Sequence, residues 1–188
     1  KEKARVLKEG CFLVEILPAE NENNYEYLYQ IKQYAKEAGF IYYSKVPWKK
    51  GTFVSNTGRK AKNTQDIMIF SKGKARNMRY DKKKTDITGE KHYMSGCNGM
   101  LPTMFDVQPV ARKNKIHQSE LPVELCEKIL EYVTYEGEIV LDSFAGSGAV
   151  GVAALNKKRS CILIEILKEN IEKIKTRFNS DLYQAALE

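Results

Sequence analysis

Residues 140–148 read V-L-D-S-F-A-G-S-G, which is a short apolar run, then the carboxylate of Asp142, then a turn rich in glycine. Gly146, Gly148 and Gly151 have the spacing G-x-G-x-x-G. Glycine suits such a turn because it adopts backbone conformations that other residues avoid and lets a ligand or a neighbouring element approach the backbone closely. This stretch therefore predicts a tight connection between a strand and a helix.

The segments around this turn alternate between strand and helix patterns. Apolar runs at 138–142 and 160–166 predict buried strands, and the patterns at 149–155 and 167–178 predict helices. Glu165 lies near the end of the second strand. Because a strand–helix–strand order requires parallel strands, the fold class is α/β, and Glu165 is expected at the same sheet edge as the glycine turn.

A glycine turn followed by an acid on the next strand is typical of nucleoside sites, where the acid accepts hydrogen bonds from the ribose hydroxyls. A tight turn with no ligand is the alternative interpretation, and the full strand–turn–helix–strand context favours the site. Asp142 distinguishes between ligands, because a carboxylate repels the pyrophosphate of a dinucleotide and attracts a cationic amine. S-adenosylmethionine has such an amine and no phosphate, so it is the predicted cofactor.

The stretch 140–148 resembles the V-L-D-P-F-x-G-S-G cofactor motif of the amino-methylating (N6-adenine or N4-cytosine) DNA methyltransferases, with Ser143 in place of proline. The preceding segment H-Q-S-E-L-P-V-E-L, residues 117–125, resembles their H-P-T-Q-K-P-L-E-L segment. Residues 7–14 and 48–70 are similar to two further stretches of the family. The order of the segments matches the permuted branch, in which the catalytic half comes before the cofactor half.

This resemblance implies a Rossmann-like methyltransferase fold, with a mostly parallel sheet, an antiparallel hairpin and an incomplete set of strands. It implies methyl transfer to the exocyclic amine of a base extruded from double-stranded DNA, by in-line attack of the amine on the methyl group. Adenine is preferred to cytosine as the target because such enzymes are more numerous. The expected cofactor-binding residues are His117, Ser119, Asp142, Phe144, Gly146, Ser147, Gly148 and Glu165.

The rest of the chain is expected to form part of the same single domain. Residues 1–71 hold predicted strands at 11–17, 40–48 and 66–70 and a helix at 25–38, with the last two strands forming an antiparallel pair. Residues 72–116 lack a sustained period and are interpreted as a target-recognition segment. Residues 117–188 form the cofactor-binding half, which opens with a helix after Pro122.

The charge of the chain is uneven. The net charge is +7 over 188 residues, but the window 45–91 holds 14 basic and 4 acidic residues. A basic surface favours a polyanion as partner, although a solvated lysine-rich surface is the alternative. The residues expected to contact DNA phosphates are Lys45, Lys49, Lys50, Arg59, Lys60, Lys82, Lys83 and Lys84.

One part of the family pattern is missing. The five prolines are never adjacent, so the catalytic tetrapeptide Asp/Ser/Asn-Pro-Pro-Tyr/Phe is absent and no catalytic residue is assigned. Because the sequence starts with Lys1 rather than Met, this tetrapeptide is expected upstream, and the chain alone is expected to be an inactive carboxy-terminal portion. The missing strand would lie between the strands at 11–17 and 138–142, so these two should not pair. A natural remnant is the alternative.

Other interpretations are weaker. An NAD-dependent oxidoreductase would share the glycine pattern but not Asp142. A module that binds nucleic acid or cofactor without chemistry is a further alternative, and it requires a gene that begins near Lys1. No spacing of the two histidines and four cysteines predicts a metal site, and no apolar run is long enough to span a membrane. A cytoplasmic protein is expected, and the family allows a homodimer and a restriction-modification partner.

Overall fold

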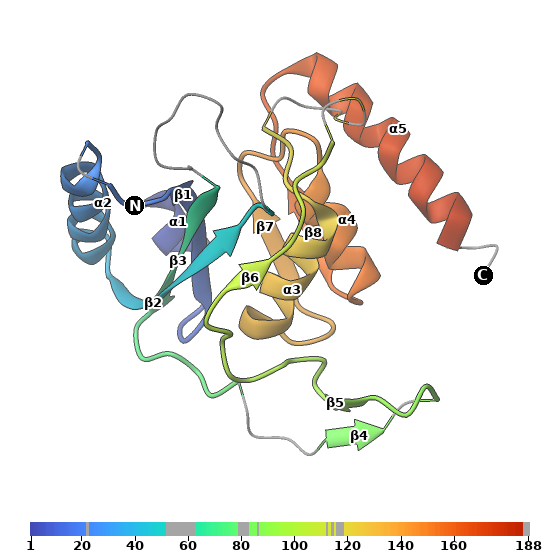
Figure 1. Cartoon of the computed structure of the whole chain (residues 1–188), viewed down its shortest axis with the longest axis horizontal. Helices are drawn as coiled ribbons and strands as arrows, with labels where there is room; N and C mark the ends of the chain where they lie inside the picture. Colours follow the sequence, from blue (N-terminus) through green and yellow to red (C-terminus); the bar gives the residue numbers. More distant parts are fainter. Residues whose placement is uncertain are drawn as a thin grey trace. The chain divides into compact units, whose positions relative to one another are not determined.

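The computed structural model describes residues 1–21, 23–51, 63–78, 83–85, 87–111, 113, 115 and 119–185, with side chains as far as residue 179. The chain forms two compact units, shown with their elements in Figure 1. The first comprises Lys1–Tyr80 and Gly99–Gln108. The second comprises Asp81–Asn98 and Pro109–Glu188.

The first unit is a mixed sheet with a helix packed on it. Its strands follow the order β1-β3-β2-β6; β3 pairs antiparallel with both β1 and β2, and β2 pairs parallel with β6. Its elements are α1 (Glu2–Val6), β1 (Phe12–Pro18), α2 (Tyr25–Glu37), β2 (Phe40–Lys49), β3 (Thr64–Lys72) and β6 (Phe105–Asp106).

The core of the first unit forms around β3. Its residues Ile67, Met68, Ile69 and Phe70 are almost fully buried, although their side chains alternate between the two faces of the sheet. Leu28 of α2 packs against Met68 and Phe70 from one face of the sheet. The predicted helix and antiparallel pair are confirmed, whereas α1 was not predicted because its five residues are too few to show a helical period.

The second unit contains the predicted strand–helix–strand–helix segment. β7 and β8 pair in parallel, with Asp142 opposite Leu163. β4 and β5 form a separate antiparallel hairpin. The elements are β4 (Lys83–Thr85), β5 (Lys91–Tyr93), α3 (Val123–Val133), β7 (Ile139–Asp142), α4 (Ala149–Asn156), β8 (Ser160–Leu163) and α5 (Lys168–Ala185).

Two boundaries in this unit differ from the prediction. β8 ends at Leu163 and not at residue 166, because its partner β7 ends at Asp142, where the Ile164 N–H donates to the Asp142 carbonyl at 2.9 Å. α5 continues seven residues beyond the predicted end at Phe178.

The two faces of the β7–β8 sheet are unlike. Val140 and Cys161 pack against a core formed by α3 and α4, which includes Leu130 and Ala153. On the alternate positions, three apolar side chains are exposed: Ile139 by 65%, Leu141 by 42% and Ile162 by 52%.

The described strands do not pair β1 with β7. β1 pairs with β3, and β7 pairs with β8, in different sheets. These pairings lie within separate units, so the expected gap between β1 and β7 and the upstream strand both stay predictions. Among the described helices, none combines the length and apolar character needed to cross a bilayer.

Gly148 closes the turn that leads into α4. Its φ of 75° lies in the left-handed region, and a Cβ at this position would approach Ile174 and Phe178 of α5 to 3.2–3.3 Å. The glycine therefore meets two requirements, one of conformation and one of space.

Gly148→Ala should lower the free energy of unfolding by about 2–5 kcal/mol, since strain at positive φ costs about 1–2 kcal/mol and overpacking about 1–3. Urea unfolding followed by far-UV circular dichroism measures this loss. Gly137→Ala is the matched control, because Gly137 in the same unit has a φ of 81° and no atom near its Cβ position. Equal losses in both variants would contradict a packing role for Gly148.

Candidate cofactor site

The site begins with the turn between β7 and α4. Gly146 and Gly148 have φ values of 51° and 75°, and the Gly148 N–H donates to the Ala145 carbonyl at 2.7 Å. The Ala145 N–H donates to the Ile164 carbonyl at 3.0 Å, just beyond the end of β8. The turn is thus fixed to the carboxyl end of both parallel strands, where ligands bind in open α/β sheets.

Asp142 is the last residue of β7 and lies at this edge. Its Oδ1 accepts the Phe144 N–H at 3.0 Å, which orients the carboxylate at the start of the turn. The side chain lines a pocket together with residues of the turn. Asp142 therefore places a carboxylate beside the space where a ligand would lie.

Glu165 connects the second strand to the glycine turn. Its Oε2 accepts the Gly146 N–H at 2.9 Å, and its Oε1 accepts the Leu167 N–H at 2.9 Å. These two N–H donors hold the pKa of the Glu165 carboxyl below its ordinary value of 4.5, and the Leu167 N–H has the larger effect of the two. Glu165 is consequently an anion at neutral pH. The Ile166 N–H and the Asn170 side chain also donate to this carboxylate and lower its pKa further.

The pocket encloses about 420 Å³ of empty space, a figure that includes open solvent. One wall is the segment that precedes α3, and the other is the end of β7 with the turn and the start of α4. Its lining residues are Ser119, Glu120, Leu121, Asp142, Phe144, Ala145, Gly146, Ser147, Ala149 and Val150.

Two exposed apolar side chains lie at the site. The Phe144 ring is 81% exposed at the pocket, and Ile166, directly after Glu165, is 90% exposed. Apolar and aromatic surfaces of this kind are suited to contact the faces of a planar base. Together with the carboxylates, they form a site with apolar surface for a base and anionic groups for hydroxyls or a cation.

The hydrogen bonds of the turn argue against a pyrophosphate ligand. Pyrophosphate sites use the backbone N–H groups of a glycine turn and helix start as donors. Here the N–H groups of Phe144, Gly146 and Gly148 donate to Asp142, Glu165 and Ala145 respectively. None of the described residues that line the pocket is a lysine or an arginine.

The structure brings most of the predicted cofactor residues together. Ser119, Asp142, Phe144, Gly146 and Ser147 line this single pocket. Gly148 starts α4, and Glu165 bonds to the turn. His117 lies outside the described residues.

Sequence reasoning missed several residues at this site. Glu120 and Leu121 line the pocket, and their place in the 117–125 segment was a signal that could have identified them. Arg177 donates to Glu120 at 2.7 Å and to the Ser147 carbonyl at 3.1 Å. No sequence signal marked Arg177, because 57 residues separate it from Glu120.

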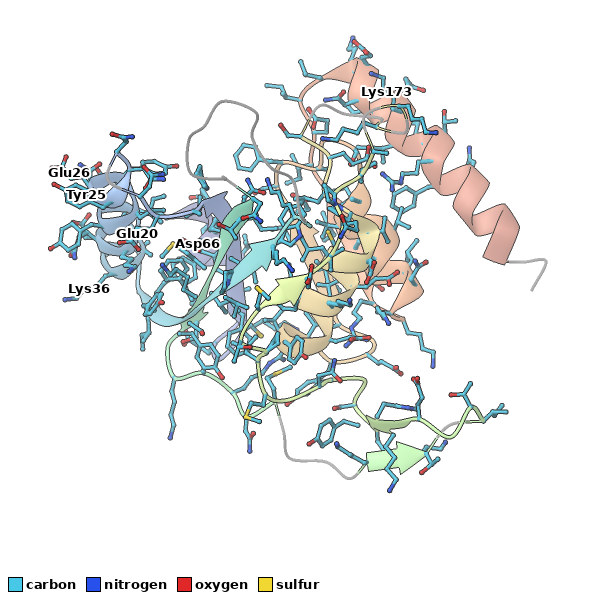
Figure 2. All side chains as sticks on the ribbon, viewed as in Figure 1. Glu20, Tyr25, Glu26, Lys36, Asp66 and Lys173 are labelled. Carbon is cyan, nitrogen blue, oxygen red and sulfur yellow. The ribbon has the colours of Figure 1, made fainter. Side chains whose placement is uncertain are left out.

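Several of the predicted DNA-contacting lysines have intramolecular partners. In the first unit, Lys45 lies 3.0 Å from Glu20 and 3.4 Å from Asp66, the two carboxylates labelled in Figure 2. Lys49 pairs with Asp106 at 2.8 Å, and Lys50 lies over the Trp48 ring at 4.9 Å.

The β4–β5 hairpin carries two more of these lysines. Lys83 and Lys84 are exposed, and the Lys83 ammonium lies 5.3 Å from the centre of the Tyr93 ring. Arg59, Lys60 and Lys82 lie outside the described residues.

Comparison with known proteins identifies the family. The chain belongs to the N6_N4_Mtase family of DNA methylases, whose model matches residues 1–176. The type II methyltransferase M.HpaI of Haemophilus parainfluenzae is 30% identical over 162 residues, which are 82% of this chain and 50% of that protein. The putative methylase YubD of Escherichia coli (strain K12) is 45% identical over 56 residues, which are 30% of this chain and 25% of YubD. The chain thus spans about half the length of M.HpaI, and the predicted family is confirmed.

Solved structures confirm the α/β methyltransferase fold. The crystal structure of the M1.HpyAVI–SAM complex is 25% identical, with a TM-score of 0.71 over 94% of this chain and 78% of that one. The PvuII DNA methyltransferase (cytosine-N4-specific) is 20% identical, with a TM-score of 0.67 over 92% of this chain and 65% of that one.

The lowered pKa of Glu165 gives a test of the turn. A carboxyl whose pKa is depressed in the folded state stabilises that state above its ordinary pKa, and this contribution is lost as the pH falls through the folded value. Protonation of Glu165 also changes the acceptor of the Gly146 and Leu167 N–H groups. The amide resonances of these two residues should shift together in an NMR titration, with a midpoint below pH 4.5. Glu165→Gln should abolish this shared transition. A midpoint at or above 4.5 would show that these amides do not bond to the carboxylate.

Proposed function

We propose that this chain is the cofactor-binding and DNA-contacting part of a methyltransferase that moves a methyl group from S-adenosylmethionine to the exocyclic amine of a DNA base. The single observation that carries the proposal is the pocket at the end of β7. It combines Asp142 and a glycine turn whose N–H groups have protein partners, and Glu165 bonds to that turn.

The residues of the pocket fit this cofactor. Asp142 would hold its cationic amine, and Glu165 would accept the ribose hydroxyls. Phe144 and Ile166 offer exposed apolar surface for the adenine base. The cofactor would supply the methyl group, while this chain binds and orients it. The occupied turn donors make a dinucleotide a poor match, which disfavours the oxidoreductase alternative.

Asp142→Ala should abolish binding of S-adenosylmethionine and leave the protein folded, because the carboxylate is the expected partner of the amine and lies at a strand end. Isothermal titration calorimetry with S-adenosylmethionine, S-adenosylhomocysteine and NAD measures this. Glu124→Gln on α3, whose exposed carboxylate pairs with Lys128, is the control and should bind normally. Unchanged affinity of Asp142→Ala would show that the amine is held elsewhere, and binding of NAD alone would overturn the methyltransferase proposal.

The catalytic group is proposed to lie outside these 188 residues. The sequence contains no Pro-Pro pair, and β1 and β7 are each paired on one side only among the described strands. The exposed apolar face of Ile139, Leu141 and Ile162 also needs a covering element in a stable α/β domain. We therefore propose a preceding segment that inserts a strand and covers this face. The target is proposed to be adenine in preference to cytosine.

The chain by itself should bind S-adenosylmethionine but transfer no methyl group to DNA. An assay with a labelled methyl donor measures this, with a gene product that includes the upstream coding sequence as the positive control. Mass spectrometry of the digested DNA should then give N6-methyladenine. Methylation by the chain alone would refute the proposed missing segment. Detection of N4-methylcytosine would refute the preference for adenine. Inactivity of the longer product would favour a binding remnant.

Double-stranded DNA is the proposed partner of the basic residues. The β4–β5 hairpin is the best-supported contact, because its Lys83 and Lys84 are exposed, whereas Lys45 and Lys49 lie in ion pairs. Exposed lysines bind phosphates as point charges and release counterions from DNA. A homodimer, a restriction-modification partner and a cytoplasmic location remain part of the proposal on the family's account alone.

Replacing both Lys83 and Lys84 with Ala should weaken DNA binding several-fold and lower the slope of log K against log salt by about 2. Fluorescence anisotropy at several salt concentrations measures both quantities. Lys173→Ala is the control, because this lysine lies on α5 (Figure 2) and pairs there with Glu169. An unchanged salt slope in the double variant would exclude the hairpin as a phosphate contact.

A further inference from the structure

Arg177 joins two walls of the pocket without lining it. Its Nη1 lies 2.7 Å from Glu120 Oε1 and 3.1 Å from the Ser147 carbonyl. The side chains of Arg177 and Glu120 are 13% and 2% exposed, so the ion pair is largely removed from water. One guanidinium on α5 thus connects the segment before α3 to the glycine turn.

The two groups that it holds belong to different walls. Glu120 lies in the wall before α3, and Ser147 lies between the two positive-φ glycines of the turn. The Ser147 carbonyl belongs to the peptide that joins Ser147, a lining residue, to Gly148 at the start of α4. A donor that fixes this carbonyl and Glu120 at once therefore fixes the separation of the walls.

Charge gives this arrangement a second effect. Glu120 and Asp142 both line the pocket, and an uncompensated buried carboxylate would compete with Asp142 for a cationic group. The guanidinium of Arg177 offsets the charge of Glu120. Asp142 is then the carboxylate of the pocket wall that can direct a cation.

Stability alone is a weak reason for such a pair. A buried ion pair can often be replaced by apolar residues of similar volume with little loss, since the desolvation of two charges offsets their attraction. What an apolar residue cannot reproduce is a charged nitrogen, Nη1, that donates to a carboxylate and a carbonyl simultaneously.

We propose that Arg177 is a positioning residue for the methyl-donor pocket, acting through Glu120 and the Ser147 carbonyl. This inference rests on the proposed function of the same site. It goes further by assigning the shape and charge balance of the pocket to a side chain that contacts no ligand.

Arg177→Met and Arg177→Lys test the proposal, with calorimetric binding of S-adenosylmethionine at a temperature well below the melting point of each variant. Arg177→Met should weaken binding at least tenfold, which corresponds to about 1.4 kcal/mol. Arg177→Lys keeps the charge but not the planar fork, so it should give an intermediate loss. If Arg177→Met does not fold, the affinity of Arg177→Lys still tests the proposal.

Arg159→Met is the matched control. Arg159 is another buried arginine of this unit, 3% exposed, and it donates to the carbonyls of Gly96 and Thr134. It lies directly before the first residue of β8, at the strand end opposite to Glu165. Its loss should lower the melting temperature and leave the affinity within about twofold, because a merely structural change does not reach the pocket.

The outcomes separate the two proposals. Weaker binding in both Arg177 variants with normal binding in Arg159→Met supports the positioning role. Normal affinity in Arg177→Met overturns it, and Arg177→Lys takes its place if Arg177→Met is unfolded. An equal loss of affinity in Arg159→Met also overturns it. In both cases, binding by the unsubstituted chain upholds the cofactor proposal. Absence of binding by the unsubstituted chain overturns the cofactor proposal and this inference with it.

Discussion

The hydrogen bond between the Gly146 N–H and the Glu165 carboxylate is the interaction on which the site depends. It can form because β7 and β8 pair in parallel and end together at Asp142 and Leu163. The same bond occupies a turn donor and helps to keep Glu165 ionised. A single contact thereby contributes to the shape of the turn and to the negative charge beside it.

The glycine turn is stabilised from outside as well as from inside the pocket. Ile174 and Phe178 of α5 lie close to the position of a Cβ on Gly148, and Arg177 of the same helix donates to the Ser147 carbonyl. The described side chains of α5 are not among the residues that line the pocket. Its place in the unit nonetheless determines how the turn is held, so the cofactor site depends on a helix that contacts only the back of the turn.

The basic residues show why a count of charges overstates a binding surface. Lys45 and Lys49 lie in ion pairs, and binding a phosphate would require them to exchange a carboxylate partner. Lys83 and Lys84 are exposed on a short hairpin. Electrostatic attraction to a polyanion would therefore depend on which lysines retain access to solvent and not on the net charge of +7.

The sequence by itself determined the α/β order, the glycine turn, Asp142, Glu165 and the family, because periodicity and short motifs are local properties of the chain. Most strand and helix positions followed from the same local patterns. Tertiary structure decided where β8 ends, that Gly146 donates to Glu165, and that Arg177 joins Glu120 to Ser147. Each of these depends on groups distant along the chain, which become neighbours only when the parallel strands pair and α5 packs behind the turn.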